Sequence, residues 1–239
     1  MEVTKGMKKL VFAEGICFYK LFCVCIVGSV LGDILETIYC YFKYKKWKSR
    51  SSFVYGHMSI VWGFAFVVAT VMYYTMGNAS SLCIFIVGTI LGGAYEYLCS
   101  VLAERHLGVK FWDYSTFSHN LSGRINLTYC LFWGMAALLW IRWLFPFLEI
   151  LIESIPVTIG PIICNVLAIA VFIDGLLSLV ALRRYSVRNR EGYVQENKWK
   201  KFDLYFSNER IEKVYPDLKL CNSNRQTANL KFDDFTINI

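Results

Sequence analysis

Motifs that would assign an enzymatic activity are missing from this sequence. It has no Gly-x-x-x-x-Gly-Lys-[Ser/Thr] run, the loop with which P-loop ATPases bind phosphate groups. It also has no Gly-x-Ser-x-Gly turn, which presents the nucleophile of many hydrolases. The chain therefore cannot itself be an ATPase of the P-loop kind, and we expect a protein that is not an enzyme.

Metal-binding and redox motifs are missing as well. The nine cysteines form no Cys-x-x-Cys pair, and most of them lie within apolar runs, where they are most simply small packing residues. There are only three histidines, and no two of them have a recognised metal-binding spacing. We therefore predict no metal site and no cofactor.

Runs of alternating polar and apolar residues, which a membrane β-barrel needs, are absent too. The chain is instead rich in apolar side chains: 56% of its 239 residues are hydrophobic, 17% are aromatic, and the mean hydropathy is +0.43. Several apolar runs approach the roughly twenty residues with which a helix crosses a bilayer. We predict an all-α, polytopic membrane bundle of about five transmembrane helices, at residues 19–42, 53–75, 82–103, 128–148 and 157–182.

Basic residues predict the orientation of these helices. Four lysines follow the first span, whereas the segment between the second and third spans has no basic residue. Because cytoplasmic loops are enriched in Lys and Arg, we place the first loop, the third loop and the C-terminal tail in the cytoplasm and the N-terminus outside. Three lysines near the N-terminus, Lys5, Lys8 and Lys9, argue against this orientation.

Residues 1–182 are therefore predicted to form the transmembrane domain of a multi-pass cell-membrane protein, with a basic cytoplasmic tail over residues 183–239. Trp199, Phe202 and Phe206 are spaced to line one face of a helix, which predicts an amphipathic helix against the inner leaflet. The net charge of +7 lies mostly on the same side, where it faces anionic headgroups. We expect the lipid bilayer as a partner and no nucleic acid.

Two stretches of the sequence repeat one another. The run Ile-Val-Gly-Ser-Val-Leu-Gly at 26–32 resembles Ile-Val-Gly-Thr-Ile-Leu-Gly at 86–92, and each is followed by a glutamate four residues on. Downstream, Ile-Val-Trp-Gly-Phe-Ala at 60–65 resembles Leu-Phe-Trp-Gly-Met-Ala at 131–136. The repeated unit is thus a helix pair, and pairs 1–2 and 3–4 would form a parallel internal repeat.

Each copy of this repeat places two glycines and one acid at four-residue intervals on one helix face. Such small residues allow two membrane helices to approach closely. We therefore expect helix one to pack against helix three through four glycines: Gly28, Gly32, Gly88 and Gly92.

Four carboxylic acids fall within the predicted spans. An ionised carboxylate in hydrocarbon costs at least about 2.5–3.5 kcal/mol, so each acid must be neutral, paired or facing a polar cavity. In the predicted orientation all four lie in the cytoplasmic half of their helices, which predicts one acidic pocket open to that side. The alternative is that each acid only bonds to a helix or to an arginine. The four acids are Asp33, Glu36, Glu96 and Asp174.

Packing through the glycines would bring Glu36 beside Glu96. Two neighbouring carboxylates in a low dielectric share a proton, as in proton-coupled sites and general acid/base pairs. Arg124 follows the flexible Ser122-Gly123 and could swing its guanidinium into this pocket or onto a phosphate or carboxylate of a substrate. Its alternative role is that of a positive-inside anchor at the start of helix four.

Five short segments carry a resemblance to a known family: Leu31-Gly32 with Glu36-Thr37, Tyr55-Gly56, Glu96-Tyr97-Leu98, Trp112-Asp113-Tyr114-Ser115, and Asn120-Leu121-Ser122-Gly123-Arg124-Ile125. Over roughly residues 19–134 the chain resembles the ABC-transporter type IV, or CmpB-like, membrane proteins. It departs from their pattern at Asp33, where Trp is usual, and at His57, where Pro is usual. The resemblance implies a permease-like membrane protein whose site residues would be Glu36, Glu96, Trp112, Asp113, Tyr114, Asn120, Gly123 and Arg124.

Three functions stay open from the sequence. The first is a permease component or small ion-coupled transporter, with Glu36 and Glu96 as protonatable ligands and Arg124 as gate or substrate anchor. The second is a membrane enzyme acting on a lipid-linked substrate, with Asp113 or Glu96 as acid/base, which needs a cavity of headgroup size. The third is a non-catalytic partner or regulator. We favour the first, whose partners would be an ATPase subunit, another membrane protein or a second copy of the chain.

Overall fold

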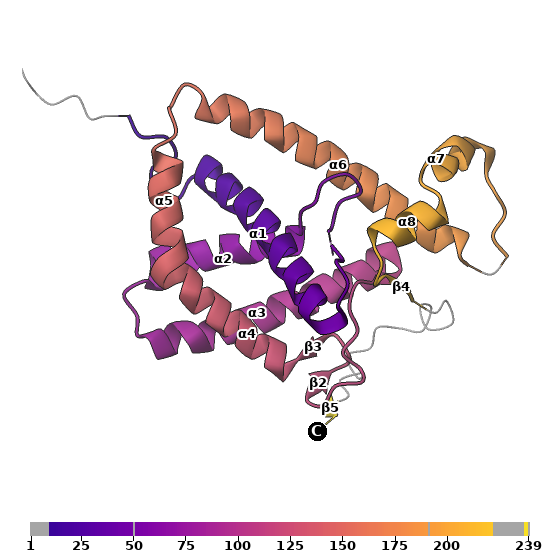
Figure 1. Cartoon of the computed structure of the whole chain (residues 1–239), viewed down its shortest axis with the longest axis horizontal. Helices are drawn as coiled ribbons and strands as arrows, with labels where there is room; N and C mark the ends of the chain where they lie inside the picture. Colours follow the sequence, from indigo (N-terminus) through magenta and orange to yellow (C-terminus); the bar gives the residue numbers. More distant parts are fainter. Residues whose placement is uncertain (1–9, 50, 191, 222–236, 239) are drawn as a thin grey trace, which may run out of the picture.

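The computed structural model describes residues 10–49, 51–190, 192–221 and 237–238, and most of these residues are helical (Figure 1). Short irregular turns interrupt the helices: π-helical turns at Ala103–Leu107 and Trp140–Leu144, and a 3₁₀ turn at Asn197–Trp199. The α-helices are α1 (Phe18–Tyr44), α2 (Ile60–Met76), α3 (Ser81–Leu102), α4 (Leu127–Leu139), α5 (Phe145–Glu153), α6 (Gly160–Arg188), α7 (Lys200–Tyr205) and α8 (Asn208–Val214). The strands have two residues each: β1 (Val109–Lys110), β2 (Asn120–Leu121), β3 (Ile125–Asn126), β4 (Lys219–Leu220) and β5 (Ile237–Asn238).

The predicted all-α membrane bundle is confirmed. In the part of the chain that is described, four helices are long and apolar enough to cross a membrane: α1, α3 with its π turn, the continuous α4–α5 helix, and α6. The shorter α2 is also apolar and has 17 residues, near the lower limit for a span. These five helical segments occupy the places of the five predicted spans.

Two span boundaries differ most from the prediction. The second helix begins at Ile60 and not at residue 53, because the backbone before it bonds to side chains instead of forming a helix. The Ser51 hydroxyl donates to the carbonyl of Met58 at 3.0 Å, and the amide of Gly56 donates to Asp174 at 2.7 Å. The last long helix continues beyond residue 182 to Arg188, because its final turns are buried against the tail.

The glycine stripes pack helices within each pair, which corrects the expected contact between helices one and three. A Cβ on Gly32 would lie 2.2 Å from the Cβ of Trp62, so α1 contacts α2 here. A Cβ on Gly92 would lie 2.3 Å from the Cβ of Trp133, so α3 contacts α4 in the same way. The other two glycines of the stripes, Gly28 and Gly88, face Phe66 of α2 and Ala137 of α4.

The fourth predicted span bends at its π turn, and Figure 1 shows α5 turned away from the direction of α4. Such turns are a common cause of sharp helix bends. Trp140 in this turn is buried and its indole donates to the hydroxyl of Thr70 at 3.0 Å. Arg142 donates to the carbonyl of Gly77 at 2.6 Å, which holds the bend against the loop between α2 and α3.

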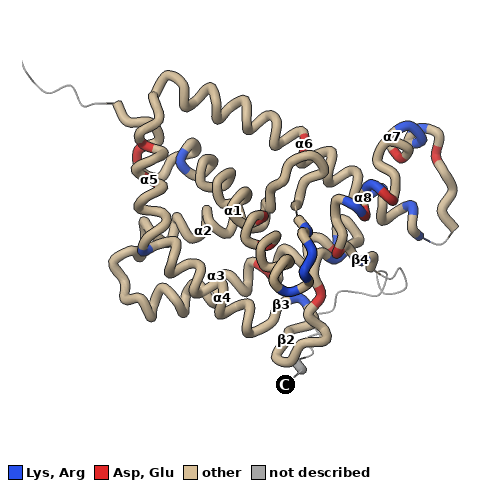
Figure 2. The backbone as a smooth tube through the Cα atoms, viewed as in Figure 1, with Lys and Arg blue, Asp and Glu red and all other residues tan. Residues whose placement is uncertain are grey.

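A buried lysine that sequence analysis did not single out joins the first helix to α5. Lys20 has no exposed surface, and its ammonium group donates to Glu149 at 3.0 Å and to Glu153 at 2.6 Å. Tyr74 of α2 also donates to Glu149. This ion-pair cluster lies at the end of the bundle opposite the tail, where Figure 2 shows few other charges.

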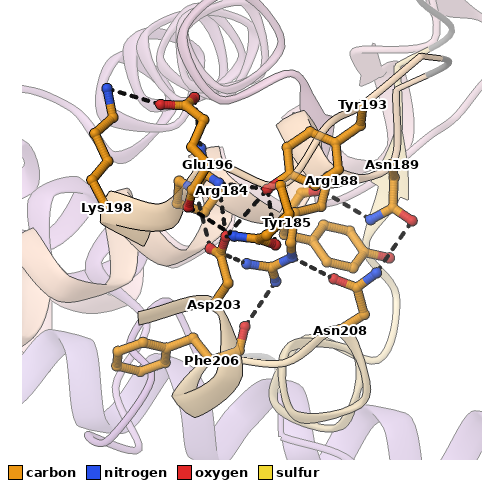
Figure 3. Close-up of polar contacts among 11 residues, drawn as sticks. Arg184, Tyr185, Arg188, Asn189, Tyr193, Glu196, Lys198, Asp203, Phe206 and Asn208 are labelled. Atoms are coloured by element: carbon orange, nitrogen blue, oxygen red, sulfur yellow. Dashed lines mark hydrogen bonds and ion pairs between the residues drawn. The ribbon is translucent and has the colours of Figure 1, made fainter. Parts of the chain in front are cut away.

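Helices α7 and α8 of the tail pack on the end of α6, in place of the predicted single amphipathic helix. We call these two helices the cap. Phe206 and Ile211 are buried against Leu182 and Tyr185 of α6. A charged cluster holds the cap from its other side (Figure 3), with Asp203 accepting from Arg184 and Arg188. Phe206 therefore packs in a protein core and not in lipid.

The first loop, the third loop and the tail meet at one end of the molecule. Residues 215–221, which we call the strap, connect them. Lys48 of the first loop pairs with Asp217, and Lys219 pairs with Asp113 of the third loop at 3.2 Å. Strand β4 in the strap pairs with β1 in antiparallel register. Figure 2 shows Lys and Arg gathered around the end of α1, near β3 and on α7 and α8.

Candidate functional site

A cavity of about 1230 Å³ lies between the two helix pairs, α6 and the strap. Its lining is mainly apolar and aromatic, and it comes from α1, α2, α3, α4 and α6 together with the third loop. Pockets for small molecules in proteins occupy about 300–1,000 Å³, so this cavity has room for an amphipathic ligand. The acids and lysines among its lining residues are Glu36, Lys43, Glu96, Asp113, Asp217 and Lys219.

Two glutamates from different helix pairs face this cavity, and each is bonded to a tryptophan of its own pair. The indole of Trp62 donates to Glu36 Oε1 at 2.5 Å, and the indole of Trp133 donates to Glu96 Oε2 at 2.9 Å. The two indole rings pack on each other with their centroids 4.8 Å apart. The structure thus links the two carboxylates through a central pair of indoles.

The glycine stripes explain this arrangement. Glu36 and Glu96 each lie one helical turn after a glycine, and each of these glycines lets a tryptophan of the neighbouring helix approach the backbone. The indole of that tryptophan then meets the carboxylate one turn along the helix. The same set of residue types thus builds the same bond in both helix pairs.

An aromatic wall extends from Glu96 toward the loops. Tyr114 of the third loop donates its hydroxyl to Glu96 Oε1 at 2.8 Å and stacks on Tyr129 of α4, with ring centroids 4.7 Å apart. The hydroxyl of Tyr129 lies 3.2 Å from that of Tyr39, which accepts from Lys43 at 3.0 Å. The chain of contacts therefore runs from a membrane carboxylate to a lysine at the end of α1.

The strap closes the cavity on the loop side with ion pairs. Asp113 accepts from the amide of Ser115 at 3.1 Å and from Lys219 at 3.2 Å. Burial alone would raise the pKa of Asp113, but these hydrogen bonds outweigh it and hold the pKa below its usual value. Asp113 is therefore an ionised group of the cavity mouth, paired with the strap.

The Asn120–Ile125 segment is a β-hairpin. Strands β2 and β3 are joined by residues 122–124, and two of these, Ser122 and Gly123, have positive φ, 53° and 68°. The amide of Arg124 donates to the carbonyl of Leu121 at 3.0 Å, which closes a turn around Ser122 and Gly123, and the positive φ of the second residue favours glycine. The Asn120 side chain accepts from the amide of Gly123 at 2.8 Å, so both residues shape the turn.

Arg124 leaves this hairpin toward α3 and not toward the cavity. Its guanidinium donates to Glu104 at 3.0 Å and lies over the ring of Tyr97. Its carbonyl accepts from the indole of Trp112 at 2.9 Å. Trp112 lines the cavity, so this bond fixes one of the cavity walls to the hairpin.

The other two membrane acids stabilise loops. Asp33 is buried and accepts from the Ser49 hydroxyl at 2.7 Å, which fixes the first loop to α1. Asp174 of α6 accepts from the backbone amides of Tyr55 and Gly56 at 3.3 and 2.7 Å. Both acids thus bond to residues of the first loop, whereas the alternative above supposed a helix or an arginine as the partner.

The cavity thus brings together Glu36, Glu96, Trp112, Asp113 and Tyr114 of the predicted site. The hairpin residues Asn120, Gly123 and Arg124 lie outside the cavity lining and support the third-loop part of its wall. The first loop is held by Asp33 and Asp174. Sequence analysis missed the direct partners of the two glutamates, Trp62 and Trp133, although both stand in the repeated motif. In the described chain, no group of three His, Cys, Asp or Glu side chains could hold a metal ion.

Residues 22–179, which run from the start of α1 into the second half of α6, match the family described as "Putative ABC-transporter type IV". The chain belongs to this family. The match spans both helix pairs and the hairpin, so it includes the whole glutamate–tryptophan arrangement, while the cap and the strap lie outside it. No curated protein and no solved structure matches the chain at a significant level.

Proposed function

We propose that this family member is the membrane component of a transporter, a permease whose substrate binds in the 1230 Å³ cavity. The observation that supports this most is the position of Glu36 and Glu96 on the cavity wall, each bonded to an indole. Acids inside membrane helices mark substrate and ion pathways by default, because their burial is costly. The ABC-transporter-type family of the chain agrees with this role.

In this proposal the two glutamates bind and release protons as substrate enters and leaves. Indole and phenol donors stabilise a carboxylate without neutralising it, so a proton or a substrate can still change its charge. The cavity mouth at the strap faces the cytoplasm, as the basic first loop predicts. An ATPase subunit, which this chain cannot replace, or an ion gradient would supply the energy.

Ligand-dependent stabilisation in detergent tests the binding site. We would heat purified full-length protein with a panel of amphipathic cations, anions, neutral amphiphiles and phospholipids. A ligand at about a hundred times its dissociation constant adds about 2.7 kcal/mol to the free energy of unfolding, a readily measured effect. We expect at least one ligand whose effect is lost in Glu96→Gln and kept in Glu14→Gln, an exposed control outside the cavity.

Transport in reconstituted vesicles tests the mechanism. Glu96→Gln keeps the shape of the side chain but cannot exchange a proton, so we expect normal folding and no substrate-dependent proton movement. The same vesicles with Glu14→Gln should behave as the wild type. A Glu96→Gln protein that still moves substrate and protons together would contradict the proposed role of this residue.

A membrane enzyme acting on a lipid-linked substrate is the second candidate, because the cavity has room for a headgroup. Asp113 at its mouth would then be the acid/base group, and the product would carry a changed headgroup. Incubating the protein with lipid-linked substrates and analysing the lipids by mass spectrometry separates this function from transport. The third candidate, a non-catalytic partner, predicts binding of no small molecule by either wild type or variant.

A further inference from the structure

We infer that the cavity selects amphipathic organic cations with flat aromatic or bulky apolar groups. This inference rests on the proposed function, since it names the class of substrate for the same cavity. It follows from three properties of the lining: its aromatic faces, the sign of its charges and the depth at which the acids lie.

Aromatic faces dominate the part of the cavity around the two glutamates. Trp62 and Trp133 pack on each other between the two carboxylates, and Phe132 and Phe172 also line the cavity. Cations bind over aromatic rings within about 6 Å of the ring centre, and tryptophan binds them best. A ligand with an apolar body and a cationic centre satisfies both the rings and the carboxylates.

The charges that line the cavity are acidic in balance. Four carboxylates line it, against two lysines and one histidine: Glu36, Glu96, Asp113 and Asp217, and Lys43, Lys219 and His106. Both lysines have partners of their own. Lys219 pairs with Asp113, and Lys43 donates to the hydroxyl of Tyr39 with its ammonium 5.7 Å from the ring centre of Phe117.

The four acids of the lining also lie at different depths in the molecule. The pairs of Asp113 and Asp217 with lysines are at the strap, where the loops meet, whereas Glu36 and Glu96 lie within the helices. Glu96 is almost fully buried and its bonded groups include a neutral indole and a neutral phenol. A cation that passes the strap therefore reaches two carboxylate side chains between aromatic walls, a setting that suits a cation better than an anionic lipid headgroup.

Two ions of the same shape and opposite charge test this inference. Tetraphenylphosphonium and tetraphenylborate both have four phenyl rings around one central atom, so a difference in their affinity reports charge alone. We would measure the binding of each to the full-length protein in detergent, by equilibrium dialysis against matched micelles. Wild type should bind the phosphonium at least about tenfold more tightly than the borate, the size expected for a desolvated cation over tryptophan.

Variants locate the bound cation. Glu36→Gln and Glu96→Gln should each weaken phosphonium binding by about tenfold or more, and Trp133→Leu should also weaken it. Glu14→Gln, exposed and outside the cavity, should leave it unchanged. Gel filtration and the unfolding temperature check each variant for folding. Glu36 is only half-buried, so Glu36→Gln carries the test even if Glu96→Gln fails to fold.

Each outcome separates the inference from the proposed function. Equal binding of both ions, or phosphonium binding that neither glutamine variant changes, would overturn the selection of cations and leave a substrate cavity in place. Binding of neutral amphiphiles alone would do the same. If neither ion nor any amphiphile or phospholipid binds to the folded wild type, the cavity is not a substrate site and the proposed function fails with the inference.

Discussion

The side chain of Trp133 reaches Glu96 only because residue 92 has no side chain. A Cβ on Gly92 would lie 2.3 Å from the Cβ of Trp133, and real Cβ atoms essentially never come so close. The atom that it would meet belongs to the rigid part of the tryptophan, so the contact cannot be relieved by a rotation about χ1. The two helices would have to separate, and the bond between Trp133 and Glu96 would lengthen.

We therefore expect Gly92→Ala to destabilise the protein by about 1–3 kcal/mol, the usual cost of overpacking. The matched control is Gly175→Ala on α6, where the added Cβ would meet its nearest neighbour, Phe53, at an ordinary 3.4 Å. Thermal unfolding of both variants in the same detergent makes the comparison. Equal stability of the two variants would show that the close contact of α3 and α4 at Gly92 is not required.

Residue identity alone could predict part of this site. The stripes around Gly32 and Gly92 and the acids after them are visible in the sequence, because both copies of the motif share them. Their partners Trp62 and Trp133 are visible only as a second repeated motif, since nothing in the sequence says which helix faces which. The sequence likewise does not reveal where the side chain of Arg124 points. It was expected near the acids of the pocket, but it bonds to Glu104 because of the position that the hairpin gives it.

The cap on α6 depends on one buried carboxylate. Asp203 is 7% exposed, and it accepts from Arg184 at 3.1 and 2.7 Å and from Arg188 at 2.7 Å. Burial alone would raise the pKa of Asp203, but hydrogen bonds from Arg184, Gln195 and Arg188 outweigh it and hold the pKa well below its usual value. Figure 3 shows the side chains of Arg184 and Arg188 beside Asp203.

Asp203→Asn should therefore loosen α7 and α8, by about 3–5 kcal/mol of local stability, because it leaves the buried Arg184 and the largely buried Arg188 without their carboxylate. Glu196→Gln is the control, since the Glu196 side chain is 49% exposed and lies 4.0 Å from Arg184. Hydrogen exchange of the cap amides measures both effects. Unchanged exchange in Asp203→Asn would mean that the apolar contacts of Phe206 suffice to hold the cap.

The pH dependence of the cap follows from the same pKa. Because the pKa of Asp203 is lowered by folding, its contribution to stability is complete above its usual value of 3.8 and is lost as the pH falls further toward the folded pKa. Cap amides of the wild type should thus exchange faster, relative to the intrinsic rate at each pH, below about pH 4. In Asp203→Asn this additional loss should be absent.

Sequence pattern identified the aromatic residues of the tail but not their surroundings. Trp199, Phe202 and Phe206 are spaced as on an amphipathic helix, which fits a membrane surface equally well as a protein surface. The outcome depends on contacts with the end of α6, where Arg184 lies 4.9 Å from the ring centre of Trp199. Such contacts between separate elements decide whether these aromatic residues lie against a leaflet or in a protein core, and the spacing of residues along one helix does not reveal them.

Across the whole molecule, the loops divide into two groups at opposite ends of the helices. The first loop, the third loop and the cap are joined by the strap, whereas the loop between α2 and α3 binds Arg142 at the other end. Five membrane spans require this division. Most of the basic residues lie at the end where the first loop, the third loop and the cap meet. In the orientation predicted from the basic loops, every loop that the strap joins would lie in the cytoplasm.

Thiol labelling in intact cells tests this orientation. Asn78 lies in the loop between α2 and α3 and Thr116 in the third loop, and both are exposed. A membrane-impermeant maleimide should label Asn78→Cys in whole cells, whereas Thr116→Cys should react only after the membrane is opened. The parent chain, whose native cysteines lie mostly within helices, gives the background. The reverse pattern would place the strap and the cavity mouth outside, and substrate would then enter the cavity from the other side of the membrane.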